Sequence, residues 1–256
     1  MGDIELNLNK LGDCEKLMDE AERDAEFYRI IKTQPIFQKR RDILKNIPKF
    51  WYLIIAENDD FSDYVSVEDL KYLESISDIY VHYKIADDNE LRAKDFSITI
   101  EFDNEEGGRL VPSQTITKHF TVTIEDGEEK ITSEPASIVW PTELDLINPQ
   151  LIKSESKKTG KPIDKKLYRM GMKSFFAWFD WTGEKPGKEF RNGEDLTRLI
   201  IDDLFPYAVK YYTEALPGGD EGDDTSDPEE LDLSEDEHDS QQDSEDDHDK
   251  KKRKLN

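Results

Sequence analysis

The stretch DFSITIEFD, residues 95–103, decides the fold class. Its apolar residues alternate with polar ones, which is the pattern of a β-strand with one buried face. Two further runs show the same alternation. Their apolar positions are Ile79, Val81, Tyr83 and Ile85 before this stretch, and Ile116, Phe120, Val122 and Ile124 after it, with Lys118 in the inward register. Turn residues connect the runs, so we expect an antiparallel meander with one apolar face, to which residues 138–140 can add a fourth strand.

The apolar face of the predicted sheet needs a cover, and the aromatic stretch SFFAWFDWTG, residues 174–183, can supply part of it. Three phenylalanines fall on one helical stripe and are predicted to belong to the core. They are Phe175, Phe176 and Phe179. Trp178 and Trp181 lie off this stripe, so they either pack under the loop that follows or face a partner.

The rest of the C-terminal third predicts further helices. One is expected from Asp195 to Leu204, with Asn192 or Gly193 as its cap, and a short one follows Pro206. Residues 153–166 are expected to form a Lys-rich loop.

The first fifty residues are predicted to form a long helix. Apolar residues recur every three or four positions, with the mean spacing of a coiled-coil seam. The predicted seam comprises Ile4, Leu8, Leu11, Cys14, Met18, Ala21, Ala25 and Tyr28. Pro35 can end or kink the helix, because its ring clashes with the preceding turn. A helix of this length cannot bury its stripe against a small domain, so the same helix of a second chain is favoured over an intrachain hairpin.

Together these elements predict an α+β protein. We expect a dimerisation helix over residues 1–50 and an α/β domain over residues 51–217, in which helices cover a four-stranded antiparallel meander. Residues 218–256 are predicted to be a disordered acidic tail that ends in a basic cluster, because their composition cannot build a core.

The net charge of the chain limits the kinds of molecule that the protein is expected to bind. The formal net charge is −25 over 256 residues, and the segment from Asp220 to Asp249 holds 17 acidic residues and no Lys or Arg. Residues 1–219 are acidic as well, with 43 acidic and 30 basic residues. Such a surface repels nucleic acids and anionic membranes and attracts cations. We therefore expect cationic partners, no sequence-specific nucleic-acid binding and no membrane contact.

The sequence contains no convincing motif for catalysis, for metal binding or for secretion. Cys14 is the only cysteine, and the N-terminus lacks the pattern of a signal peptide, so we expect an intracellular protein. The run from Gly183 to Lys188 is one residue short of a phosphate-binding loop, and the four histidines have no metal-ligand spacing. The expectation is a protein without catalytic residues, metal or cofactor.

Four stretches together resemble one family. QPIFQKRRDILKNIPKFW (34–51), DFSITIEFD (95–103), TITKHF (115–120) and SFFAWF (174–179), followed by an acidic tail, are similar to the nucleosome assembly protein/SET family of histone chaperones. WTGEKPGKEF (181–190) and PYAVKYYTEA (206–215) are most similar to a fungal SET-like chaperone that partners a histone acetyltransferase.

The resemblance implies a fold, a function and partners. It implies a headphone-shaped homodimer in which each long helix continues through a kink near Pro35 and each α/β "earmuff" presents an acidic underside to core histones. It also implies nucleosome assembly, the presentation of histones to an acetyltransferase, and a nuclear location. A regulatory adaptor, or an inhibitor of a chromatin enzyme such as a phosphatase, is the alternative function.

The charged residues of the C-terminal part of the chain are the candidates for histone binding and for nuclear import. Asp202 and Asp203 end a predicted helix, where carboxylates oppose the helix dipole, so they are predicted to bind histones unless they form a solvated helix end paired with Lys210 or Arg198. The predicted tail contacts are Asp220, Glu221, Asp223, Asp224, Glu235, Asp236, Glu237, Glu245, Asp246 and Asp247. The basic cluster Lys250, Lys251, Lys252, Arg253 and Lys254 is predicted to be a nuclear import signal, or else a tail end that neutralises the acidic run.

Overall fold

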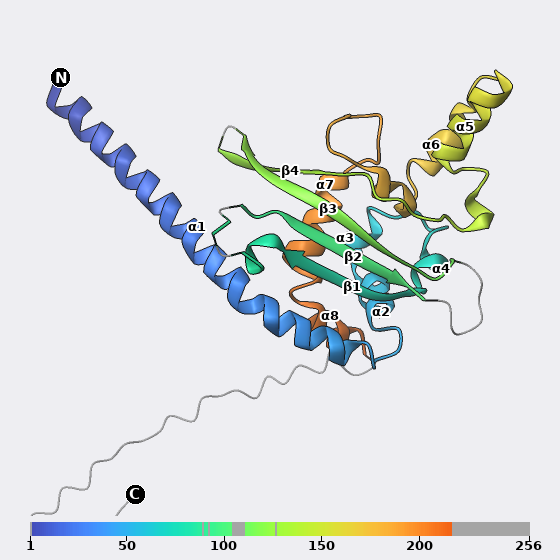
Figure 1. Ribbon diagram of the computed structural model, residues 1–256, viewed down its shortest axis with the longest axis horizontal. Coiled ribbons are helices and arrows are strands. Elements are labelled where there is room, and N and C mark those ends of the chain that lie inside the picture. The colour runs from blue at the N-terminus through green and yellow to red at the C-terminus, as the bar shows by residue number, and fades with distance from the viewer. Residues whose placement is uncertain (1, 89, 92, 104–110, 126, 217–256) are drawn as a thin grey trace, which may run out of the picture. The chain divides into compact units, whose positions relative to one another are not determined.

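The computed structural model describes residues 2–216, except residues 89, 92, 104–110 and 126 (Figure 1). Most of these residues lie in an α+β arrangement built around one sheet. In chain order its elements are α1 (Gly2–Leu44), α2 (Phe50–Glu57), α3 (Asp59–Ser62), α4 (Leu70–Leu73), β1 (Ile76–Tyr83), η1 (Lys84–Ala86), β2 (Phe96–Phe102), β3 (Gln114–Glu125), β4 (Glu128–Ser133), η2 (Thr142–Leu144), α5 (Pro149–Thr159), α6 (Lys165–Gly171), η3 (Phe175–Asp180), α7 (Gly193–Arg198), η4 (Leu199–Leu204) and α8 (Ala208–Ala215). None of the described helices is long and apolar enough to cross a lipid bilayer.

The four strands form an antiparallel meander in the order β1-β2-β3-β4. The three alternating runs form β1, β2 and β3, and β2 buries every second residue. Two predicted positions differ: β1 ends at Tyr83, so Ile85 lies in η1, and Ile124 near the end of β3 is 58% exposed. The fourth strand is not the predicted one. Residues 138–140 are outside the sheet, where the side chain of Gln114 bonds both the N–H and the carbonyl of Val139, while β4 occupies the sheet edge. Only Ile131 of β4 is buried, so its sequence alternates too weakly to be recognised.

The aromatic stretch forms η3, a 3₁₀ helix, and not the predicted α-helix. With three residues per turn, positions 175 and 178 lie on the same side, and the rings of Phe175 and Trp178 stack with centroids 6.0 Å apart. Trp178 is fully buried and donates through Nε1 to the carbonyl of Gly193. Trp181 is buried too, against Gly193. Both tryptophans therefore belong to the core, and neither faces a partner.

The segment expected as a Lys-rich loop is mostly helical. Asn148 caps α5 by accepting the backbone N–H of Gln150 at 2.9 Å, and Gly160, at φ 67°, ends the helix. Asp164 then caps α6 by accepting from the N–H groups of Lys166 and Leu167. The capping residues Asn148, Gly160 and Asp164 can be recognised in the sequence. The many lysines between them favoured the prediction of a loop.

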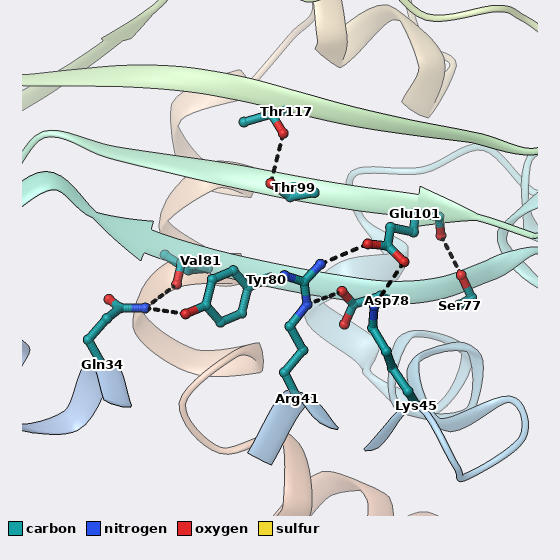
Figure 2. Close-up of polar contacts among 10 residues, drawn as sticks. All are labelled: Gln34, Arg41, Lys45, Ser77, Asp78, Tyr80, Val81, Thr99, Glu101 and Thr117. Atoms are coloured by element: carbon teal, nitrogen blue, oxygen red, sulfur yellow. Dashed lines mark hydrogen bonds and ion pairs between the residues drawn. The ribbon is translucent and has the colours of Figure 1, made fainter. Parts of the chain in front are cut away.

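Helix α1 continues through Pro35 to Leu44, so the proline does not end it. Figure 2 shows how the second half of this helix is fixed to the sheet. Gln34 donates through Nε2 to the hydroxyl of Tyr80 and the carbonyl of Val81, at 2.9 and 3.0 Å. Arg41 pairs with Asp78 and Glu101 on neighbouring strands. Burial raises the pKa of Asp78, and the Arg41 charge opposes that rise.

Candidate functional site

The C-terminal helices place Asp202 and Asp203 on an irregular turn. Helix α7 passes directly into η4, whose residues have π-helical hydrogen bonding. Asn192 is the N-cap residue of α7, as the sequence predicts. It adopts a left-handed conformation with φ 56° and makes no capping bond through its side chain. π-helical turns are rare and are frequent at functional sites.

Asp203 is held by a tyrosine of the next helix. It accepts a hydrogen bond of 2.7 Å from the hydroxyl of Tyr211, and this bond raises the pKa of Tyr211 to about 12. The expected pairing with basic neighbours does not occur among the described residues. Lys210 lies 3.8 Å from Glu214, and Arg198 pairs with Glu194. Asp203 therefore keeps its charge uncompensated by a direct cation.

Other carboxylates gather near Asp203. Repulsion from Asp195, Asp63 and Asp60 adds to burial in raising the pKa of Tyr64, and Asp203, Glu214 and Asp60 act in the same direction on Tyr211. These five residues, from four segments of the chain, form what we call the acidic patch: Asp60, Asp63, Asp195, Asp203 and Glu214. The sequence does not predict this patch, because the carboxylates meet only in the fold.

Asp202 lies in a different setting. Surrounding protein displaces water from its carboxylate and raises its pKa, while Arg198 and Lys94 oppose that rise. Lys94 itself bridges Glu26 of α1 and Glu129 of β4. Asp202 also lines a pocket of about 250 Å³ between α1 and η4. The two aspartates predicted as one pair thus face a mixed-charge pocket and the acidic patch respectively.

The predicted dimerisation residues all lie on an uncovered face of α1. Leu8, Leu11, Met18 and Tyr28 are 58–65% exposed, and Ala21 and Ala25 are exposed as well. Phe27, Ile30 and Leu44 are buried against the chain's own domain. The uncovered apolar face also continues past Pro35 through Ile36 and Ile43, at 61% and 64% exposure. Both residues lie within the dimerisation helix that the sequence predicts over residues 1–50.

The remaining candidates are not described by the structure. The predicted tail contacts and the cluster from Lys250 to Lys254 lie outside the described residues. Within the described part of the chain, no group of three or more His, Cys, Asp or Glu side chains is placed to hold a metal ion.

The fold and the site define an acidic α+β protein with a long helix whose apolar face is uncovered and with a cluster of carboxylates on its domain. The family model "Nucleosome assembly protein (NAP)" matches residues 15–215. The chain belongs to the nucleosome assembly protein family.

Individual relatives agree with the family. Vacuolar protein sorting-associated protein 75 of Saccharomyces cerevisiae is 40% identical over 208 residues, which are 80% of this chain and 76% of that protein. A putative nucleosome assembly protein of Schizosaccharomyces pombe is 35% identical over 72% of this chain and 69% of its own length. The crystal structure of Vps75 matches with a TM-score of 0.71 over 80% of this chain and 96% of its own, at 40% identity. That of Ccp1 matches with a TM-score of 0.60 over 81% and 94%, at 30% identity. These matches confirm the predicted fold.

Proposed function

We propose that this protein is a homodimeric histone chaperone without catalytic activity. The observation that carries the proposal is an acidic patch in which Asp203 pairs with no cation of the described residues, in a member of the nucleosome assembly protein family. Core histones are strongly cationic proteins, and a surface of this sign attracts them. Asp202, beside its pocket, and the carboxylates of the tail are proposed as further histone contacts.

The proposed mechanism is competition. Histones bind DNA non-specifically through Lys and Arg side chains, and the release of counterions drives that binding. A chaperone that occupies the same side chains removes weak, improper histone–DNA contacts and leaves the better-fitting nucleosomal ones. Because each exposed ion pair contributes about 0–1 kcal/mol, the affinity must come from many pairs and must fall as salt screens them.

Presentation of histones to a histone acetyltransferase is the finer part of the proposal, and it rests on the resemblance of residues 181–190 and 206–215. Pull-down from nuclear extract at low and high salt tests it. We expect histones to be lost at high salt and an acetyltransferase to persist through a shape-specific contact. Recovery of histones without any acetyltransferase at either salt would remove this role.

The acidic patch gives a specific prediction. Replacing Asp60, Asp63 and Asp203 by asparagine removes three charges, while the amide oxygen introduced at the third of these positions can still accept from Tyr211. Because each exposed pair contributes about 0–1 kcal/mol, we expect histone affinity at low salt to fall about three- to tenfold. Fluorescence titration with purified core histones measures the change.

A matched control removes three charges elsewhere. Asp42, Asp87 and Asp145 are exposed and lie outside the acidic patch, and their replacement by asparagine should change affinity less than twofold. Equal losses in both triple variants would show that only net charge matters and that the acidic patch is not a distinct surface.

The tail is proposed to strengthen histone binding without being essential to it, because residues 1–219 remain acidic on their own. A chain ending at Gly219 should bind histones more weakly and with a flatter salt dependence. Its thermal unfolding should be unchanged. Complete loss of binding after this truncation would assign the whole binding function to the tail and contradict a role for the acidic patch.

The protein is proposed to act in the nucleus, with residues 250–254 as its import signal. A fluorescent fusion lacking residues 250–256 should lose nuclear enrichment. If localisation is unchanged, the signal lies elsewhere, and the lysines of residues 153–166 become the next candidates.

A further inference from the structure

Helices α5 and α6 carry a positive surface on an otherwise acidic protein. Residues 149–173 contain eight Lys and Arg side chains and only two acidic ones. All eight are exposed, and none forms an ion pair within the described part of the chain. They are Lys153, Lys157, Lys158, Lys161, Lys165, Lys166, Arg169 and Lys173. We call residues 145–173 the basic hairpin.

The basic hairpin also has an apolar groove. A cavity of about 570 Å³ opens between α5, α6 and the segment that joins them. Leu151 and Ile163 line it while 44% and 38% exposed, and Leu146 at its edge is 76% exposed. Lys158 and Lys161 line the same groove, together with the carboxylates of Asp145, Glu155 and Asp164. The Asp164 carboxylate is already engaged in capping α6.

The basic hairpin is fixed to the rest of the domain at its base. Gly171 packs so closely that a Cβ atom there would lie 1.7 Å from the carbonyl oxygen of Ile147. Gln150 donates through Nε2 to both carboxylate oxygens of Asp180 at 2.7 Å. In Figure 1 the two helices stand out beyond the end of the sheet, away from α1. The groove is thus a fixed feature presented to solvent on the side away from the dimerisation helix.

We propose that the basic hairpin docks an acidic peptide segment of a partner protein, one in which large aliphatic side chains are set among carboxylates. The lysines complement the carboxylates, and the groove takes the aliphatic side chains. A histone has the wrong charge for this surface, so the partner is a different protein from the proposed histone cargo. A nucleic-acid duplex would match the lysines but would leave the apolar groove unused, which favours the peptide.

A consequence is that both kinds of partner can be bound at once. The acidic patch and the basic hairpin have opposite charge, so a cationic cargo and an acidic partner do not compete for one surface. The proposal does not depend on the identity of the cargo.

The test is a titration with a fluorescent synthetic peptide of about a dozen residues that contains two leucines within a run of glutamates. The full chain and the chain ending at Gly219, which keeps every described residue, are measured in parallel. Lys158→Glu with Lys161→Glu should weaken binding at least tenfold, because two attractive charges become repulsive. Lys185→Glu with Lys188→Glu reverses two exposed lysines of another loop and should change binding less than twofold.

Two further measurements test whether the apolar groove contributes to peptide binding in addition to charge attraction. Leu151→Ser in the protein, and Leu→Ser in the peptide, should each weaken binding several-fold. A DNA duplex that binds more tightly than the peptide, and is insensitive to Leu151→Ser, would overturn the proposal in favour of a phosphate-binding surface. Absence of peptide binding in both chains would also overturn it. Histone binding by the Lys158→Glu, Lys161→Glu variant should persist, which keeps this outcome separate from that of the proposed chaperone function.

Discussion

Replacing Lys118 by methionine is expected to lower the free energy of unfolding by about 2–4 kcal/mol, because it removes three hydrogen bonds from a buried site and leaves one carbonyl without a donor. Lys118 is fully buried in β3. Its ammonium donates to the carbonyl oxygens of Glu134, Phe179 and Trp181 at 2.8, 2.9 and 2.7 Å. One side chain thus joins the sheet to the segment after β4 and to the end of η3. Methionine fills similar space but removes all three hydrogen bonds. The carbonyls of Phe179 and Trp181 keep a second donor, the N–H of Ala136 and the hydroxyl of Ser133, whereas the carbonyl of Glu134 loses its donor.

Urea denaturation of the two proteins measures this loss. Lys130→Met is the matched control, because Lys130 lies on β4 with its side chain at the surface, paired with Glu125. It should change the unfolding free energy by less than about 1 kcal/mol. A Lys118→Met protein as stable as the control would show that the hydrogen bonds of Lys118 add nothing to the stability of the fold.

The same lysine predicts a pH dependence. Burial lowers the pKa of Lys118 to about 7, whereas an unfolded lysine has a pKa of about 10.4. Between these values the unfolded chain binds more protons than the folded one, so this group adds stability as pH rises. The stability advantage of the wild type over Lys118→Met should therefore increase from pH 7 to pH 10. A constant difference would mean that Lys118 stays fully protonated in the fold.

Replacing Leu11 and Met18 by glutamate is expected to convert the dimer into a monomer. Both residues lie on the uncovered face of α1, at 59% and 58% exposure. In a dimer seam the two changes would place four carboxylates where apolar side chains must pack, and unpaired buried charge is strongly destabilising. Light scattering at micromolar concentration should give twice 29.8 kDa for the wild type and 29.8 kDa for the variant.

The control for this prediction lies on the opposite face of the same helix. Asn9→Glu with Lys16→Gln changes the net charge by the same amount at the same seven-residue spacing, and both residues are exposed. This variant should remain dimeric. A wild type that is monomeric at micromolar concentration would contradict the proposed seam directly, whatever the variants do.

The sequence predicts the features that repeat along the chain. Alternation identifies β2 and its neighbours, and the three-to-four spacing identifies α1, because each pattern reflects one face of one element. The fourth strand cannot be placed in this way, because β4 has a single buried residue, Ile131. The position of Trp178 is undecided in the sequence because η3 has three residues per turn and not 3.6, which moves the ring into the core.

The site is harder to predict because it depends on contacts distant in sequence. The inward position of Lys118 is visible from alternation, but its acceptors lie at residues 134, 179 and 181. Nothing in the sequence distinguishes Asp60 and Asp63 from other surface residues. They become candidates only because the fold brings them near Asp195, Asp203 and Glu214. Asp202 and Asp203 are adjacent in the chain, yet adjacent side chains of a helix point in different directions, and these two meet different neighbours in the fold.

The most direct test of the central claim is the affinity of the full chain for core histones as a function of salt. If a dispersed acidic surface binds the cationic histones, the affinity should be highest at low salt and should fall by about a hundredfold or more between about 0.05 and 0.5 M NaCl, since salt screens exposed ion pairs. The acidic-patch variant should show a shallower fall. Absence of histone binding at low salt, or an affinity that does not change across this range, would contradict the account.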